Sequence, residues 1–115
     1  MTPFGAHIRS IREERGISQK QMAEDLHISA AYLSAMEHGR RGKPSPGLVM
    51  QICGYLGIIW DDVEEVKALA LLSHPKVTLD TSGLSADRTE LANRLAKRIR
   101  NLPDSVVEAM LALLR

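Results

Sequence analysis

The sequence contains little cysteine and few aromatic residues. Its 115 residues include one cysteine, Cys53, and aromatic residues make up 3% of the chain. A single cysteine excludes an internal disulfide, and with it the small secreted folds that several disulfides hold together. Scarce aromatics favour a helical core of Leu, Ile, Val, Met and Ala over a sandwich of aromatic-rich strands. The composition therefore predicts a mostly helical protein in a reducing compartment.

Long apolar runs and a strong net charge are also missing. Nowhere do about 18 uncharged apolar residues follow one another, and the first 16 residues carry charges where a secretory signal would be apolar. We therefore expect a cytoplasmic protein that makes no membrane contact. The formal net charge is +1, so overall charge does not by itself indicate a nucleic-acid partner.

Motifs of catalysis and metal binding are absent from the sequence. The 4 histidines stand at no metal-ligand spacing, and there is no Cys-x-x-Cys, phosphate loop or nucleophile elbow. Cys53 lies on an apolar helical stripe, which is typical of a buried structural thiol. We expect no catalytic residue, no metal and no cofactor.

Signals for the start and end of helices are frequent in the first 73 residues. Hydroxyl residues that can cap a helix precede apolar residues repeating at helical spacing, and glycines follow several of these stretches. "SQKQ" at Ser18 and "DDVE" at Asp61 read as capping boxes, in which the third residue after the cap reaches back to it. The predicted helices cover about 3–15, 18–26, 30–38, 46–56 and 61–73.

The pattern changes at His74-Pro75. "KVTLDTSG" alternates apolar or β-branched with polar residues, so it is either a short strand or an ordered linker. Ser85 then caps a sixth helix, and Pro103 starts a seventh. We predict three parts: a first domain over 1–73, a linker over 74–84, and a helical hairpin over 85–115.

The stretch "GISQKQMAEDLHISAAYLSAMEHGRRGKPSPGLVMQICGYLGI" resembles the helix-turn-helix domain of the Cro and lambda-repressor-like (Xre-type) transcriptional regulators, over about residues 4–66. Physical reasons support the match: Ala23 lets two helices approach, Ile28 fills the turn, and Leu33 anchors the following helix. The resemblance implies an all-α, five-helix DNA-binding domain, followed here by a two-helix extension with a linker or short strand between them.

The resemblance also implies a reading surface. In this family the third helix, here about 30–38, enters the major groove of double-stranded DNA with its first residues against the bases. It begins after Ser29, and Ala30, Ala31, Tyr32 and Ser34 occupy the positions that contact bases. Many relatives have glutamine at the first of these positions. Alanine removes an amide contact to adenine, so the operator sequence does not follow from these residues.

Further residues are placed along the phosphates by the same resemblance. Arg40, Arg41 and Lys43 follow the reading helix, and Gln19 and Lys20 stand at the N-terminus of the helix before it. The family also commonly pairs an arginine of the first helix with a glutamate of the third, here Arg12 and Glu37. The alternative is that both are solvated charges.

One such domain contacts only about half a turn of operator, so we expect a homodimer, formed through residues 76–115. The function that the resemblance implies is that of a bacterial or phage-type transcriptional regulator, a repressor that binds an operator. The alternative is an antitoxin-like or adaptor protein whose C-terminal helices bind a protein partner while the first domain autoregulates.

Overall fold

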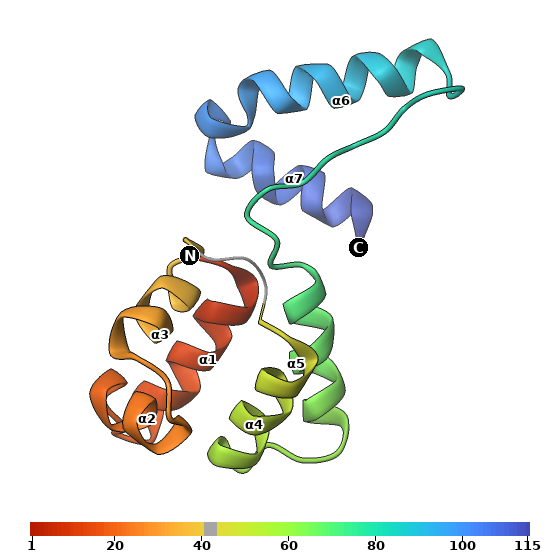
Figure 1. Cartoon of the computed structure of the whole chain (residues 1–115). Helices are drawn as coiled ribbons and strands as arrows, with labels where there is room; N and C mark the ends of the chain where they lie inside the picture. Colours follow the sequence, from red (N-terminus) through yellow and green to blue (C-terminus); the bar gives the residue numbers. More distant parts are fainter. Residues whose placement is uncertain (41–43) are drawn as a thin grey trace. The chain divides into compact units, whose positions relative to one another are not determined.

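The computed structural model describes residues 1–40 and 44–115, and every regular element in these ranges is a helix (Figure 1). The predicted all-α class is confirmed. The chain divides into two compact units, Met1–Val77 and Thr78–Arg115. The first contains α1 (Pro3–Glu14), α2 (Gln19–Leu26), α3 (Ala30–Glu37), α4 (Pro46–Leu56) and α5 (Asp61–Leu71), and the second contains α6 (Ala86–Arg98), the 3-10 helix η1 (Ile99–Asn101) and α7 (Asp104–Leu114).

Hydroxyl caps begin most of these helices, because a side-chain oxygen can accept one of the N–H groups that the first turn leaves without a partner. Each cap accepts the N–H of the residue three positions on. The caps are Thr2, Ser18, Ser29, Ser45 and Ser85, with N···O distances of 2.9, 3.0, 2.9, 3.2 and 3.3 Å. The predicted capping box at Ser18 is half formed, since the Gln21 side chain donates to Asp25 at 2.9 Å instead of reaching back.

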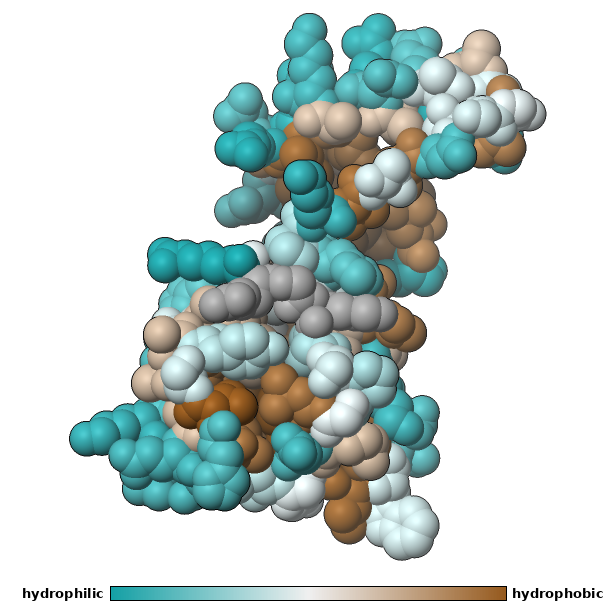
Figure 2. Space-filling model, viewed as in Figure 1, coloured by the Kyte–Doolittle hydropathy of each residue, from teal (hydrophilic) through white to brown (hydrophobic). Residues whose placement is uncertain are grey.

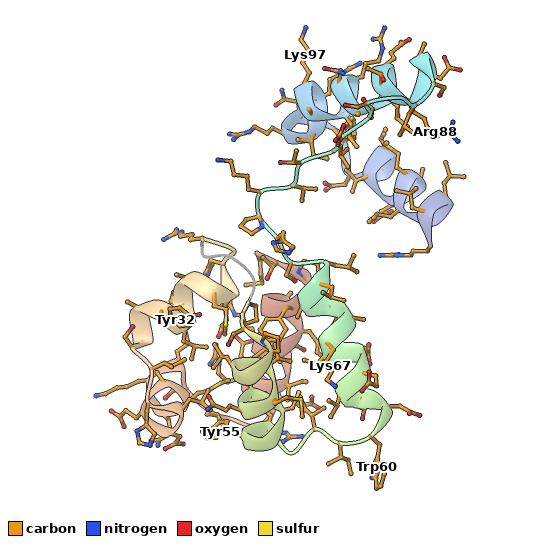
Figure 3. The ribbon with its side chains drawn as sticks, turned by 45° about the vertical axis from the view of Figure 1, so that its right-hand side comes forward. Tyr32, Tyr55, Trp60, Lys67, Arg88 and Lys97 are labelled. Atoms are coloured by element: carbon orange, nitrogen blue, oxygen red, sulfur yellow. The ribbon has the colours of Figure 1, made fainter. Side chains whose placement is uncertain are left out.

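Helix α5 starts differently from the prediction. Its N-cap is Trp60, which has φ 57° and makes no side-chain cap, so the predicted capping box at Asp61 is wrong. Asp61, Asp62 and Glu64 all lie inside the first turn, where the helix dipole favours carboxylates. The Trp60 side chain points away from the unit and is 83% exposed (Figure 3).

The core of the first unit receives apolar side chains from all five of its helices. Fully buried residues come from every one of them: Phe4, Ile8, Met22, Leu33, Ile52, Leu56 and Val66. Each such side chain stabilises the fold by about 1.5–3 kcal/mol relative to exposure. The third helix can therefore be held firmly although only Leu33, Met36 and Glu37 of its residues are buried.

A buried serine joins the two ends of this unit. Ser73, just beyond α5, accepts the N–H of Phe4 at 2.9 Å and donates to the carbonyl of Leu69 at 2.6 Å. The Phe4 N–H belongs to the first turn of α1 and has no partner within its own helix. The hydroxyl thus satisfies it and anchors the start of α1 on α5.

The stretch 74–84 is described throughout and forms no strand within the chain. It is shaped by local turns: Asp80 accepts the N–H of Ser82 at 2.9 Å, and Thr81 accepts that of Leu84 at 3.0 Å. No helix in the described ranges is long and apolar enough to cross a membrane.

The second unit is a two-helix hairpin whose apolar side chains meet between its helices. Hydrophilic residues cover the outer side of α6, and hydrophobic residues gather toward α7 (Figure 2). A 120 Å³ hollow is lined entirely by apolar residues: Leu95, Ile99, Leu102, Val107, Met110, Leu111 and Leu114. None of the residues of this unit is buried, as expected for so few residues without a covering partner.

Candidate nucleic-acid interface

A short turn sets α2 and α3 across each other. His27 ends α2 in the left-handed conformation, with φ 58° and ψ 38°, and its neighbour Ile28 donates its N–H to the carbonyl of Ala23 at 3.0 Å. Ser29 then starts α3 by capping Tyr32. Because both helix ends are closed by local hydrogen bonds, the turn holds one geometry.

The first turn of α3 presents small side chains to solvent. Ala30 and Ala31 are exposed, and Ser34, one turn further along, is half-buried. Tyr32 is also half-buried and contacts the core (Figure 3). The predicted base-reading residues thus lie together at one end of one helix. Small side chains there let a neighbouring molecule approach the helix backbone closely.

The N-terminus of α2 lies close to the end of α3. Lys20 is exposed, whereas Gln19 is half-buried and its side-chain amide donates to Glu37 Oε1 at 3.2 Å. The N–H of Gln21 is taken by Ser18. The backbone N–H groups of Gln19 and Lys20 are the ones that the helix leaves pointing outward.

A buried ion pair holds α3 against α1. Arg12 donates from Nε to Glu37 Oε2 at 3.3 Å and from Nη2 to Oε1 at 3.2 Å, and its Nη1 donates to the carbonyl of Ile17 at 2.9 Å. Glu37 is 0% exposed and Arg12 is 7% exposed. The predicted pairing is confirmed, and the alternative of two solvated charges is wrong. With Gln19, the guanidinium satisfies the carboxylate in a site that water does not reach.

His38 is a candidate contact that the reading of the sequence missed. It follows α3, is exposed, and its Nδ1 lies 2.8 Å from the carbonyl of Ser34. Ala31, Ser34 and His38 are spaced three and four apart, which places them on one helical face. This spacing is the feature of the sequence that could have indicated His38 as a candidate contact.

The segment after α3 leaves along the start of α1. Gly39 has φ 74°, and a Cβ there would stand 2.9 Å from Thr2 Cγ2, so glycine meets both a conformational and a spatial need. Arg40 is exposed, and its N–H donates to the carbonyl of Ala35 at 2.8 Å. The predicted phosphate contacts Arg41 and Lys43 lie outside the described residues.

A further hydrogen bond fixes α4 against α2. Tyr55 donates its hydroxyl to Asp25 Oδ2 at 2.6 Å. This bond to the carboxylate, together with burial and the negative charge, raises the pKa of Tyr55 above its ordinary value, because the neutral phenol is the donor. Asp25 also accepts from Gln21 of its own helix. Its bond to Tyr55 joins α2 to α4.

Cys53 is 1% exposed, as the apolar stripe predicted, and burial raises the pKa of its thiol. Within the described part of the chain, no group of three or more His, Cys, Asp or Glu side chains is arranged to hold a metal ion.

The match to a known family lies in the first unit. A family model described as a helix-turn-helix domain matches residues 3–66, which span α1 to the middle of α5. The chain belongs to the helix-turn-helix domain family. The resemblance expected from the residues is confirmed.

Curated relatives of this helix-turn-helix domain carry regulatory names. The HTH-type transcriptional repressor RghR of Bacillus subtilis (strain 168) is 36% identical over 61 residues, 53% of this chain and 45% of the relative. The uncharacterized HTH-type transcriptional regulator RghRB of the same strain is 32% identical over 63 residues, 55% of this chain and 45% of the relative. The immunity repressor protein of Bacillus phage phi105 is 39% identical over 54 residues, 47% and 37% of the two chains.

The matched region thus spans less than half the length of each of these relatives. No solved structure matches the chain.

Proposed function

We propose that this protein is a transcriptional regulator, a repressor that binds a DNA operator sequence-specifically and works in the cytoplasm. The exposed first turn of α3 carries the proposal, because it offers small side chains at the end of a helix whose other end is locked by Glu37. The major groove admits an α-helix, and the residues of its N-terminal turn then lie against the base edges. The names of the relatives support the same role.

The proposed contacts fall into two groups. Those to bases come from α3, where alanine methyl groups meet thymine methyls and hydroxyls donate to base edges or phosphates: Ser29, Ala30, Ala31, Tyr32 and Ser34. Those to phosphates surround α3: Gln19, Lys20, Arg40, Arg41 and Lys43. Since the Gln19 side chain is committed to Glu37, its backbone N–H, at the positive end of α2, is the group that meets the phosphate.

We further propose that two copies act together. One helix-turn-helix reads about half a turn of DNA, so a symmetric dimer places two reading helices on two half-sites. The hairpin of α6 and α7 supplies a surface for pairing, because its residues leave an apolar face uncovered (Figure 2). Pairing through the same face on both copies gives a closed dimer.

A salt titration tests DNA binding. The full chain is titrated against a fluorescent mixed-sequence duplex at several salt concentrations, beside Arg40→Ala/Arg41→Ala. If a dimer neutralises roughly eight phosphates, log K falls against log salt with a slope of about −7. Loss of two arginines per copy flattens the slope by about 3 to 4 units.

The matched control is Lys67→Ala/Lys76→Ala, which removes two exposed charges from outside α2, α3 and the segment that follows α3. It should leave the slope within one unit of the parent protein. Binding that does not respond to salt, or an arginine variant that matches the lysine control, would contradict the proposal.

A further inference from the structure

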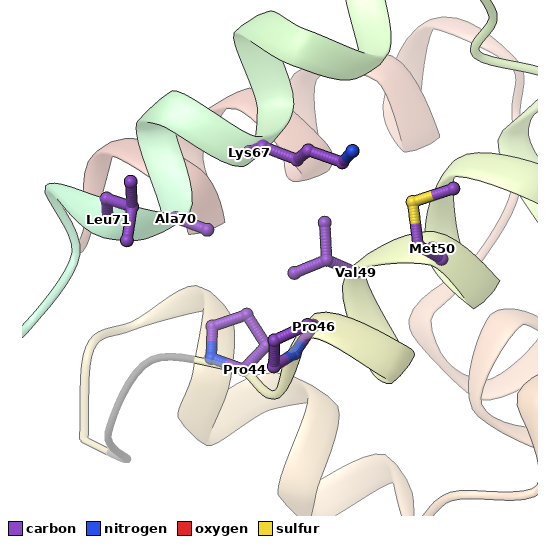
Figure 4. A pocket seen from close by; sticks show the side chains of 7 residues that line it. All are labelled: Pro44, Pro46, Val49, Met50, Lys67, Ala70 and Leu71. Atoms are coloured by element: carbon purple, nitrogen blue, oxygen red, sulfur yellow. The ribbon is translucent and has the colours of Figure 1, made fainter.

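A groove in the first unit lies between the start of α4 and the C-terminal half of α5. Its volume is about 310 Å³ (Figure 4). The side chains lining it are Pro44, Pro46, Val49, Met50, Lys67, Ala70 and Leu71. None of these residues belongs to the proposed DNA contacts.

The lining is apolar except for one cation. Lys67 is the charged residue among the lining side chains, while Met50 and Leu71 are 49% and 65% exposed. Large apolar side chains left in water beside a hollow are typical of a surface that is covered by a ligand. The volume of the groove lies at the lower end of the roughly 300–1,000 Å³ range of ligand pockets, so it suits a small ligand.

The ammonium group of Lys67 is available to such a ligand at low cost. Its side chain extends from α5 over the groove toward the α4 side (Figure 4). It pairs with Glu64 at 3.3 Å, but the two side chains are 48% and 72% exposed. An exposed pair three residues apart on a helix contributes only about 0.2–1 kcal/mol, so an incoming anion can replace Glu64.

We propose that this groove binds a small amphipathic anion, a straight aliphatic chain ending in one carboxylate. The chain packs on Val49, Met50 and Leu71, and the carboxylate pairs with Lys67. Burial of apolar area supplies most of the affinity, and the ammonium selects an anion over a neutral molecule of the same length. This ligand site goes beyond the proposed DNA binding and does not depend on it.

Octanoate, with its ten heavy atoms, is the probe. The full chain labelled with ¹⁵N is titrated with octanoate in the absence of DNA, and amide shifts are followed by NMR. The expected result is saturable shifts at Val49, Met50, Ala70 and Leu71. Octanamide, which keeps the chain and loses the charge, should bind the same amides more weakly.

Two variants and a control sharpen the test. Lys67→Gln should weaken octanoate about two- to fivefold and leave octanamide unchanged. Met50→Asp, at an exposed position, places a negative charge at the rim and should abolish octanoate binding. Lys76→Gln, an exposed lysine outside the groove, should bind octanoate like the parent.

Three results would overturn the proposal. They are no saturable shift at the groove amides, octanoate shifts confined to α6 and α7, and equal octanoate affinity in Lys67→Gln and the parent. Each can occur with DNA binding intact, so failure here is distinct from failure of the proposed function.

Discussion

The backbone of Gly5 in α1 lies directly against that of Glu37 in α3. A Cβ on Gly5 would stand 2.7 Å from the Cα of Glu37 and 2.8 Å from its carbonyl carbon. The obstacle is backbone, which cannot rotate away as a flexible side chain could. Gly5 therefore sets how closely the reading helix packs on α1.

Gly5→Ala should force α1 and α3 apart. We expect the free energy of unfolding to fall by about 1–3 kcal/mol, the usual cost of overpacking, and duplex affinity to fall as well. Gly54→Ala is the matched control, because Gly54 is also helical and its Cβ would meet nothing within 4 Å. It should raise stability by about 0.5–1 kcal/mol. Urea unfolding measures both, and equal losses in the two variants would contradict the close-packing role.

Removing one partner of the Arg12–Glu37 pair should lower the free energy of unfolding more than replacing both partners. Arg12→Ala leaves a buried carboxylate without its cation, which should lower the free energy of unfolding by about 3–5 kcal/mol. Arg12→Met/Glu37→Met removes both charges and should restore much of this loss. Urea unfolding of the two variants and the parent checks the order. A double variant less stable than the single one would be inconsistent with an uncompensated charge.

The bond from Tyr55 to Asp25 predicts a stability change at alkaline pH. The folded protein holds the pKa of Tyr55 above that of the unfolded chain, so the unfolded chain loses the phenol proton first as pH rises. The stability that this bond contributes is fully present below about pH 10. It is lost as pH rises through the pKa of Tyr55 in the folded protein. The stability difference between parent and Tyr55→Phe should shrink above about pH 10. A difference that is constant up to pH 11 would count against it.

His27 occupies a left-handed position that favours glycine. The left-handed conformation costs a residue with a Cβ about 1–2 kcal/mol, and glycine loses about 0.5–1 kcal/mol more than alanine in backbone entropy on folding. His27→Gly should therefore raise the free energy of unfolding by about 0.5–1 kcal/mol. His38→Gly, at a position with φ −91°, is the control and should lower it. Thermal unfolding distinguishes them, and destabilisation by His27→Gly would show that the imidazole makes a compensating contact.

The proposed dimer can be separated into monomers at the hairpin. Leu111 lines the apolar hollow of α6 and α7, whereas Leu113 does not and is 85% exposed. Leu111→Glu should give monomers at micromolar concentration by sedimentation equilibrium and weaken operator binding, while Leu113→Glu should remain dimeric. A parent protein that sediments as a monomer in this range would reject pairing through the hairpin.

Most helix boundaries in the first unit could be predicted, because the interactions that set them are local. The caps at Ser18, Ser29 and Ser45 bond an N–H three residues away, and the apolar spacing that marks each buried face repeats within one turn. The turn between α2 and α3 follows from the same short-range chemistry and needs no knowledge of what packs nearby. The exposed start of α3 was expected from the family resemblance.

The start of α5 shows where local signals compete. Asp61 is a good capping residue, yet the helix begins one residue earlier, after Trp60 in a positive-φ conformation. Nothing in the residues around Asp61 shows at which of these two positions the helix begins. The structure places all three carboxylates within the first turn, where the helix dipole stabilises them without a cap.

The sequence by itself determined the helical class, most of the caps and the family, since these depend on residues within a few positions of one another. Only the tertiary structure decided the contacts that make the site rigid: Gly5 against Glu37, Gln19 on Glu37, Tyr55 on Asp25 and Ser73 on Phe4. Their partners stand 18 to 69 residues apart. A contact of that kind forms only when the core has brought two helices together. Neither residue alters its local sequence pattern in a way that would identify its partner.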